Sequence, residues 1–258
     1  MELYNLGLVA ALSAAILICC SIAFADTADV SDDASAATVL AQAQTHYASI
    51  ERLKSSFRQV TYNATMGKEM IASGVYYAEK PGKVRWDYEK PDVQHLVINS
   101  GRVLFYVPAD KQLVYSDAGQ VEELKAVLDL LGGKGSLLTR FKARLLDEKE
   151  AATKGCKVVR IVPREPMGSL LRVDLSIDDE THLVKETAYW DIYGNRTKIY
   201  FSDITMPKSF DDTLFKLNVP RDVVVVDAAG NPIGSGMPSG EPPASKNEQK
   251  DSIKDDAN

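Results

Sequence analysis

The sequence predicts a mainly β fold of the α+β class, built on a long antiparallel sheet with few helices. In residues 83–88, apolar or aromatic side chains alternate with charged ones, which is the period-2 pattern of a strand with one buried face. Turn signals follow at Lys90-Pro91-Asp92 and at Asn99-Ser100-Gly101, with apolar runs between and after them. A second series of short apolar runs extends from 142 to 201. Strands joined by such tight turns pair in antiparallel fashion.

The strands are expected wherever short apolar or alternating runs lie between turn residues. Gly74 lies inside one of these runs and is expected to mark a bulge or bend, the usual meaning of a glycine within a strand. In chain order, the expected strands cover residues 55–64, 70–79, 83–88, 93–99, 102–107, 111–116, 142–146, 156–162, 170–177, 183–190 and 197–201.

Two helices are expected from apolar stripes at helical spacing. The first covers residues 36–54, with Ser35 as its N-cap. The second covers residues 121–131, begins with two glutamates that suit the positive end of a helix, and ends at Gly132-Gly133.

The two ends of the chain differ in composition from its middle. Residues 1–25 contain an apolar run and end in Ala23-Phe24-Ala25, which predicts a secretory signal peptide. A flexible acidic segment at 26–35, a folded domain at 36–228 and a disordered polar tail at 229–258 are expected to follow. The alternative to removal of the signal is an N-terminal anchor helix that stays attached. A lipid anchor on Cys20 is a second alternative, but Cys19 before it is a poor context for acylation.

Composition and motifs argue against several classes of function. The formal net charge of −6 argues against nucleic-acid binding, which needs clustered Lys and Arg. The three histidines, His46, His95 and His182, lie far apart in unrelated contexts, and the sequence contains no catalytic elbow, zinc motif or cysteine pair. We therefore expect no enzyme, no metal site and no cofactor. A hydrolase remains the weakest of the alternatives.

One run of residues also carries a resemblance to a known family. Lys80-Pro81, Arg85-Trp86, Pro91, Gly101 and Tyr106-Val107-Pro108 follow one another along the predicted meander. This run resembles the LolA family, the periplasmic carriers of lipoproteins to the outer membrane of Gram-negative bacteria. The family has an arginine before the first proline, where this chain has Lys80.

The resemblance implies an incomplete antiparallel β-barrel with a helical lid that encloses an apolar cavity. It implies a monomeric periplasmic chaperone that binds the acyl chains of lipoproteins and carries them from the inner to the outer membrane. The implied partners are acylated lipoproteins, an inner-membrane lipoprotein-releasing ABC transporter and an outer-membrane lipoprotein receptor. An anchored receptor or a lipid-sensing regulatory module of the same family is the alternative, and the apolar side chains taken without the resemblance would favour a packed core.

The expected cavity is lined by apolar side chains of the strands and roofed by the helices. A register error of one residue would exchange its inner and outer faces. In the family, the arginine before the proline bonds to carbonyls of a lid helix and holds the empty cavity shut. Lys80 is therefore expected to act as the lid latch, on the last carbonyls of helix 121–131. The expected cavity residues are Tyr47, Ile50, Val84, Trp86, Leu96, Leu104, Leu124, Leu128 and Trp190.

Overall fold

The computed structural model describes residues 33–117, 137–147 and 155–235. Each predicted strand is present, with ends shifted by a few residues. The helices of the described ranges are α2 (Ala34–Ser49), the single 3-10 turn η1 (Pro108–Asp110) and α4 (Leu137–Arg140). The strands are β1 (Arg52–Asn63), β2 (Lys68–Glu79), β3 (Lys83–Lys90), β4 (Gln94–Asn99), β5 (Arg102–Val107), β6 (Gln112–Asp117), β7 (Phe141–Leu145), β8 (Cys156–Pro163), β9 (Leu170–Asp178), β10 (Val184–Asp191), β11 (Arg196–Thr205), β12 (Val224–Val226) and β13 (Pro232–Ser235).

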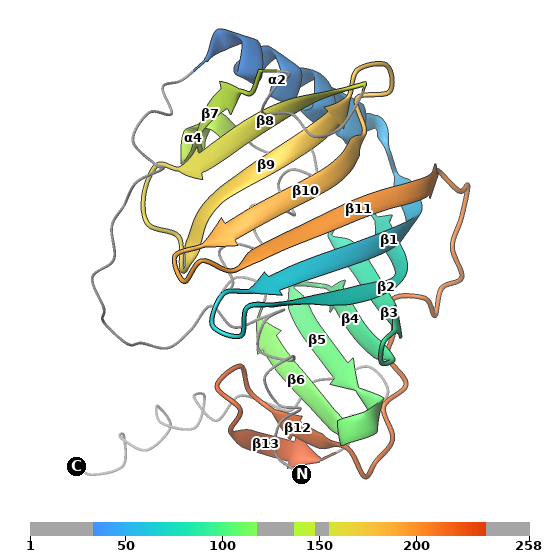
Figure 1. The fold of residues 1–258 in the computed structure, drawn as a ribbon. Coiled ribbons are helices and arrows are strands. Elements are labelled where there is room, and N and C mark those ends of the chain that lie inside the picture. The colour runs from blue at the N-terminus through green and yellow to red at the C-terminus, as the bar shows by residue number, and fades with distance from the viewer. Residues whose placement is uncertain (1–32, 118–136, 148–154, 236–258) are drawn as a thin grey trace, which may run out of the picture.

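Within the described residues, the strands form a single open sheet. Its order is β13-β12-β6-β5-β4-β3-β2-β1-β11-β10-β9-β8-β7, so two meanders meet where β1 pairs with β11. The sheet curls from β7 at one end to β13 at the other, and these two ends lie far apart (Figure 1). All neighbours are antiparallel except β12 and β6. The predicted mainly β fold with an open, curled sheet is confirmed.

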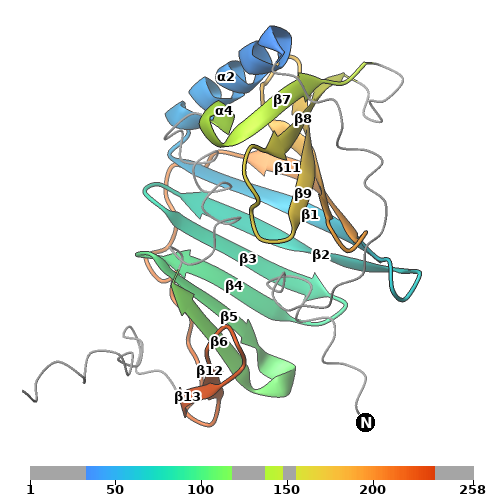
Figure 2. The ribbon, with the colours of Figure 1, turned by 90° about the vertical axis from the view of Figure 1, so that its left-hand side faces the viewer.

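Helix α2 is shorter than expected at its C-terminal end and begins two residues earlier. Its N-cap is Asp33, whose carboxylate accepts from the Ser35 backbone N–H at 2.7 Å, so Ser35 is not the cap. The other oxygen of the same carboxylate accepts from Leu145 N in β7 at 3.1 Å. The helix ends at Ser49 because Ile50 has an extended backbone, and β1 starts at Arg52. Helix α2 packs against β7 and β8 (Figure 2).

The register assigns each strand residue to one of two faces, because residues paired across an antiparallel ladder lie on the same side. Ser55 pairs with Tyr76, Tyr76 with Trp86, and Trp86 with Leu96. We call this side the inner face, since it packs with α2 into the large core cluster. The opposite side is the outer face.

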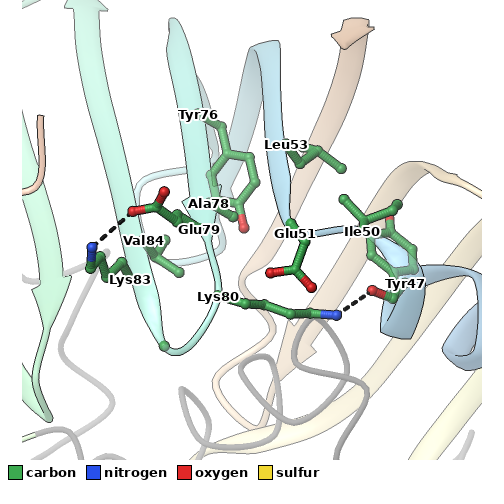
Figure 3. A pocket seen from close by; sticks show the side chains of 11 residues that line it. Tyr47, Ile50, Glu51, Leu53, Tyr76, Ala78, Glu79, Lys80, Lys83 and Val84 are labelled. Carbon is green, nitrogen blue, oxygen red and sulfur yellow. Dashed lines mark hydrogen bonds and ion pairs between the residues drawn. The ribbon is translucent and has the colours of Figure 1, made fainter. Parts of the chain in front are cut away.

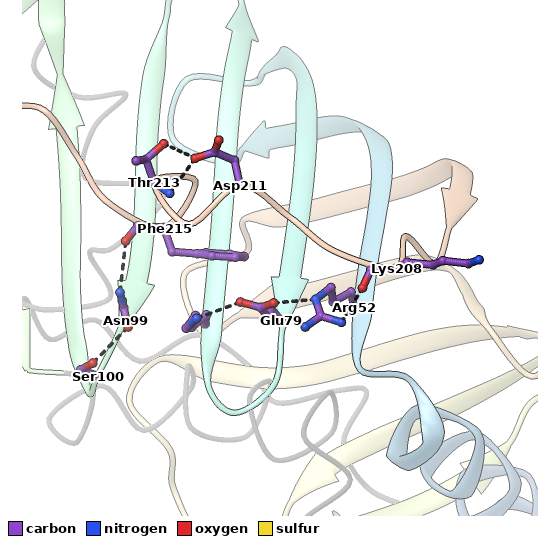
Figure 4. Close-up of polar contacts among 9 residues, drawn as sticks. Arg52, Glu79, Asn99, Ser100, Lys208, Asp211, Thr213 and Phe215 are labelled. Carbon is purple, nitrogen blue, oxygen red and sulfur yellow. Dashed lines mark hydrogen bonds and ion pairs between the residues drawn. The ribbon is translucent and has the colours of Figure 1, made fainter.

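A second, smaller cluster lies on the outer face of β5 and β6, around Leu113. Its other buried members come from the C-terminal part of the chain: Val219, Val223 and Val225. Between β11 and β12, residues 206–218, here called the strap, run across the outer face of β2–β4 (Figure 4). Arg85 of β3 donates to the Leu214 carbonyl of the strap at 2.7 Å.

The prediction of a disordered tail from residue 229 is wrong for its first residues. Strand β12 pairs with β6, and β13 then pairs with β12. The turn between them is ordered by the Asp227 carboxylate, which accepts from the backbone N–H groups of Ala229 and Asn231. Gly230 supplies the positive φ of 84° that this turn needs. In the described part of the chain, no helix is both long and apolar enough to cross a membrane.

Gly74 is predicted to be intolerant of any side chain. The pairing of β2 with β3 shifts register between Ser73 and Gly74, which confirms the expected bulge. A Cβ at Gly74 would lie 1.8 Å from the carbonyl oxygen of Asp87, in the backbone of β3. Gly74→Ala should therefore lower the free energy of unfolding by about 3 kcal/mol or more, because β3 must move away.

Chemical denaturation of Gly74→Ala and Gly234→Ala tests this steric argument. Gly234 also lies in a strand, but its Cβ would meet nothing within 4 Å. Gly234→Ala should therefore change stability by no more than about 0.5 kcal/mol. Equal stabilities of the two variants would contradict the close approach of β2 and β3.

Candidate functional site

The centre of the inner face is a cluster of aromatic rings from neighbouring strands. Trp86 of β3 lies 4.8 Å from the ring of Phe57 and 4.6 Å from the ring of Tyr76, measured between centroids. Phe201 of β11 lies 6.1 Å from Tyr76. These rings meet because the register places them side by side on one face of β1, β2, β3 and β11. They form an apolar floor with mainly edge-to-face or tilted contacts.

Beside this floor lies a small pocket between the C-terminal end of α2 and the β2–β3 hairpin (Figure 3). Its volume is about 40 Å³, which holds a few water molecules. Typical ligand sites reach roughly 300–1,000 Å³, so the pocket as it stands is closed to a lipid chain. It is lined by Tyr47, Ile50, Glu51, Leu53, Tyr76, Ala78, Glu79, Lys80, Gly82, Lys83 and Val84.

Lys80 connects the hairpin to the end of α2. Its ammonium donates to the carbonyl oxygens of Tyr47, at 2.6 Å, and of Ala48, at 2.7 Å (Figure 3). Carbonyls in the last turn of a helix lack intrahelical partners or share weak ones, and they carry the negative end of the helix dipole. A cation at this position is therefore doubly favoured.

The expected type of contact at Lys80 is thus present, but the expected helix is wrong. The carbonyls belong to the first helix, because the end of α2 lies across the pocket from the β2–β3 hairpin and within reach of Lys80. Helix 121–131 was the predicted partner, and it lies outside the described residues.

Tyr47 holds the end of α2 at a second point. Its hydroxyl accepts a hydrogen bond from the backbone N–H of Val184 in β10 at 3.1 Å. Burial raises the pKa of Tyr47 to about 12, so the hydroxyl is neutral at physiological pH. The last turn of α2 is therefore fastened to β10 through Tyr47 and to the β2–β3 hairpin through Lys80.

A group of ion pairs lies at the rim of the pocket, on the outer face of the sheet. The Glu79 carboxylate accepts from Arg52 Nε at 2.6 Å and from Lys83 Nζ at 2.8 Å. Arg52 also donates to the Lys208 carbonyl of the strap at 2.9 Å (Figure 4). Glu79 therefore links the hairpin at the pocket to the strap through Arg52.

Five of the predicted cavity residues lie on the inner face. Tyr47, Ile50 and Val84 line the pocket itself. Trp86 and Leu96 pack against the same core cluster, next to the pocket but outside its lining. Leu124 and Leu128, the predicted roof residues of the second helix, lie outside the described residues.

Two predicted cavity residues are on the wrong face. Leu104 pairs with Val97 on the outer face and packs against the cluster around Leu113. Trp190 pairs with Arg172 across β9 and β10, and the Arg172 guanidinium lies 4.2 Å from the centroid of the Trp190 ring. A cation stacked on the ring gives this aromatic side chain a partner outside the core.

Sequence reasoning missed Tyr76, Leu53 and Ala78, which line the pocket, and Phe57 and Phe201 in its floor. The sequence does not single out Tyr76, because Tyr77 follows it and an alternating pattern cannot decide which of two adjacent rings points inward. The pattern around Phe57 did contain a signal, since Leu53, Ser55 and Phe57 alternate with charged or polar residues.

The ion-pair group at Glu79 predicts a loss of stability in acid. The hydrogen bond from Lys83 holds the pKa of Glu79 below its ordinary value of 4.5, burial opposes this, and Arg52 adds to the lowering. A carboxyl group whose pKa is lower in the folded state stabilises the fold above its unfolded pKa, and this contribution disappears as the pH falls through the folded pKa. Glu79→Gln should therefore be less stable than wild type at pH 7, and the difference should shrink between about pH 5 and about pH 2.

Thermal unfolding across that pH range measures the effect. Glu89→Gln removes an exposed carboxylate from the end of β3 and should change stability by less than about 0.5 kcal/mol. A wild-type advantage over Glu79→Gln that persists undiminished at low pH would show that the charge of Glu79 is not its source.

Comparison with known proteins identifies the family. Residues 48–218, more than half of the chain, match the family described as outer membrane lipoprotein carrier protein LolA. The outer-membrane lipoprotein carrier protein of Methylococcus capsulatus is 28% identical over 179 residues, which cover 69% of this chain and 83% of the relative. That of Bordetella pertussis is 25% identical over 205 residues, which cover 79% of this chain and 93% of the relative. A solved LolA superfamily protein from Nitrosomonas europaea is similar over 70% of this chain and 96% of its own, with a TM-score of 0.38 at 9% identity. From the end of α2 to the end of the strap, the chain matches one family throughout, and it therefore belongs to the LolA family of outer membrane lipoprotein carrier proteins.

Proposed function

We propose that this protein is a periplasmic carrier that shields the acyl chains of lipoproteins on the inner face of its sheet. One observation carries the proposal: an apolar pocket lies at the aromatic floor, and the end of α2 is fastened over it by Lys80 and Tyr47. Family membership supports the same role, since the relatives are named as lipoprotein carriers.

The driving force is burial of hydrocarbon, at about 0.8 kcal/mol for each methylene group removed from water. The pocket is too small for an acyl chain in the closed state. Loading therefore requires the end of α2 to move away from the hairpin, and the two hydrogen bonds of Lys80 break in that movement. These bonds oppose uptake and favour release, which lets the carrier hold its cargo reversibly.

The proposed cargo and direction of transport are supported by family membership. Acylated lipoproteins enter from an inner-membrane lipoprotein-releasing ABC transporter, and an outer-membrane lipoprotein receptor takes them over. The transfer needs no covalent chemistry, so the proposal includes no catalytic residue and no cofactor. The protein acts as a monomer in the periplasm.

Substitution of Lys80 tests the latch. Lys80→Leu removes both bonds to α2, and charge-assisted hydrogen bonds are worth roughly 1.5–3 kcal/mol. The variant should bind a fluorescent fatty-acyl probe about tenfold more tightly, with a slower off-rate. Lys80→Arg should bind the probe less tightly than wild type, because a planar guanidinium presents a fixed fork of donors to the carbonyls where lysine has a flexible point charge.

Lys83→Leu is the matched control. Lys83 lines the same pocket on the same hairpin, but its ammonium pairs with Glu79 and not with α2. The affinity of the Lys83→Leu variant for the acyl probe should stay close to that of wild type. Equal affinities and off-rates for wild type, Lys80→Leu and Lys80→Arg would show that Lys80 is no latch. A wild-type protein that binds no acyl probe would overturn the carrier function itself.

The state of the N-terminus separates a mobile carrier from an anchored receptor. Ala23-Phe24-Ala25 predicts that the exported chain begins at Asp26 without a lipid. Intact-mass measurement of the protein purified from a Gram-negative host should give the mass of residues 26–258. A mass that includes a diacylglyceryl group on Cys20 would favour the anchored receptor.

A further inference from the structure

The hydroxyl of Tyr76 is buried on the inner face without a hydrogen-bond partner. The residue is 3% exposed, and its hydroxyl oxygen contacts no donor or acceptor within the part of the chain that the structure describes. Figure 3 shows its ring extending from β2 toward the pocket, which it lines. Buried tyrosine hydroxyls normally have a partner, so this one needs an explanation.

No described residue forms a hydrogen bond with the Tyr76 hydroxyl. The ring is packed against Trp86 and Phe201. The hydroxyl of Tyr47 lines the same pocket, and its oxygen accepts from the N–H of Val184. Ser55 pairs with Tyr76 across β1 and β2, is 1% exposed, and has a side-chain oxygen that is likewise unpartnered among the described residues. Burial raises the pKa of Tyr76, so its hydroxyl remains a neutral donor.

A ligand that enters the pocket brings the partner that the described residues lack. A hydrocarbon chain has no acceptor, but an acyl chain ends in a carbonyl group. Moving that carbonyl from water into an apolar cavity is costly unless a donor meets it there. A neutral hydroxyl suits the neutral carbonyl of an ester, whereas a carboxylate anion would call for a cation. Of the lysines in the pocket lining, Lys83 is engaged with Glu79, and Lys80 is engaged with the end of α2 while the pocket is closed.

We propose that the Tyr76 hydroxyl donates a hydrogen bond to the ester carbonyl of a bound acylglyceryl group, and that the site therefore selects esterified chains. This inference rests on the proposed function and specifies its ligand class. In the empty protein the hydroxyl is unpaired among the described residues, and in the loaded protein the ligand pairs it. The gain from this one bond corresponds to about a tenfold increase in affinity for an ester over an otherwise equal ligand without the carbonyl.

The experiment compares two fluorescent glycerolipids of equal chain length, one with ester and one with ether linkages. Wild type should bind the diester about tenfold more tightly than the diether. Tyr76→Phe removes only the hydroxyl, and it should bring the ratio of the two affinities close to one. Its melting temperature without ligand should equal or exceed that of wild type, because an unpaired buried hydroxyl is lost.

Tyr88→Phe is the matched control. Tyr88 lies on the same face in β3, but its hydroxyl already donates to the Gln59 side chain at 3.1 Å. This variant should keep the preference for the ester and melt at a lower temperature than wild type, since it loses an existing bond. If Tyr76→Phe keeps the ester preference, or wild type has none, the inference is overturned while the carrier function stands. If wild type binds neither lipid, the proposed function fails as well.

The same ester group occurs on acylated proteins and on free lipids. Two ligands distinguish these sources: a peptide with an S-diacylglyceryl cysteine, and the free diacylglycerol. Binding of each ligand is measured for the diester and for the matching diether. An ester preference with both confirms recognition of the carbonyl, and tighter binding of the peptide form assigns the ligand to lipoproteins. Loss of the ester preference in both forms of ligand would again overturn the role of Tyr76.

Discussion

The hydrogen-bond register that joins β1, β2, β3 and β11 determines which side chains can reach a ligand. Because paired residues share a face, a single set of pairings aligns Phe57, Tyr76, Trp86 and Phe201 on the inner face. The bulge at Gly74 belongs to this arrangement, since it lets the backbone of β3 approach β2 closely beside the rings. A shift of one residue in any of these pairs would send an aromatic side chain to the outer face. The apolar floor therefore depends on backbone pairing more than on any one side chain.

The sequence predicts strands better than it predicts their faces. Residues 83–88 alternate cleanly, so both the strand and the inward position of Trp86 could be predicted. Residues 102–107 contain apolar side chains at consecutive positions, because the outer face of β5 is also covered, by the C-terminal part of the chain. Alternation is absent from a strand with two covered faces, and Leu104 was therefore assigned to the wrong one.

The sequence also does not predict contacts between residues that lie far apart in the chain. The stacking of Arg172 on Trp190 joins two strands, and nothing local in the sequence signals it. The family resemblance singled out Lys80, whose bond to a helix carbonyl is present. Residues 36–54 form one continuous apolar stripe, so the sequence does not indicate that the helix ends beside Lys80. The strand β13 was missed because Gly and Pro suggest disorder, although they also form the ends of short edge strands.

The N-cap residue of α2 also affects whether the edge of the open sheet can pair with another molecule. Within the described residues, strand β7 pairs with β8 on one side only, so its other edge offers free backbone groups to any foreign strand. Asp33 occupies two of them: its N–H donates to the Ala143 carbonyl at 3.0 Å, and its carboxylate accepts from Leu145 N. At the opposite edge, β13 is only four residues long and starts with proline, which makes it a poor template. Both margins of the described sheet thus carry features that oppose edge-to-edge pairing with another copy of the chain.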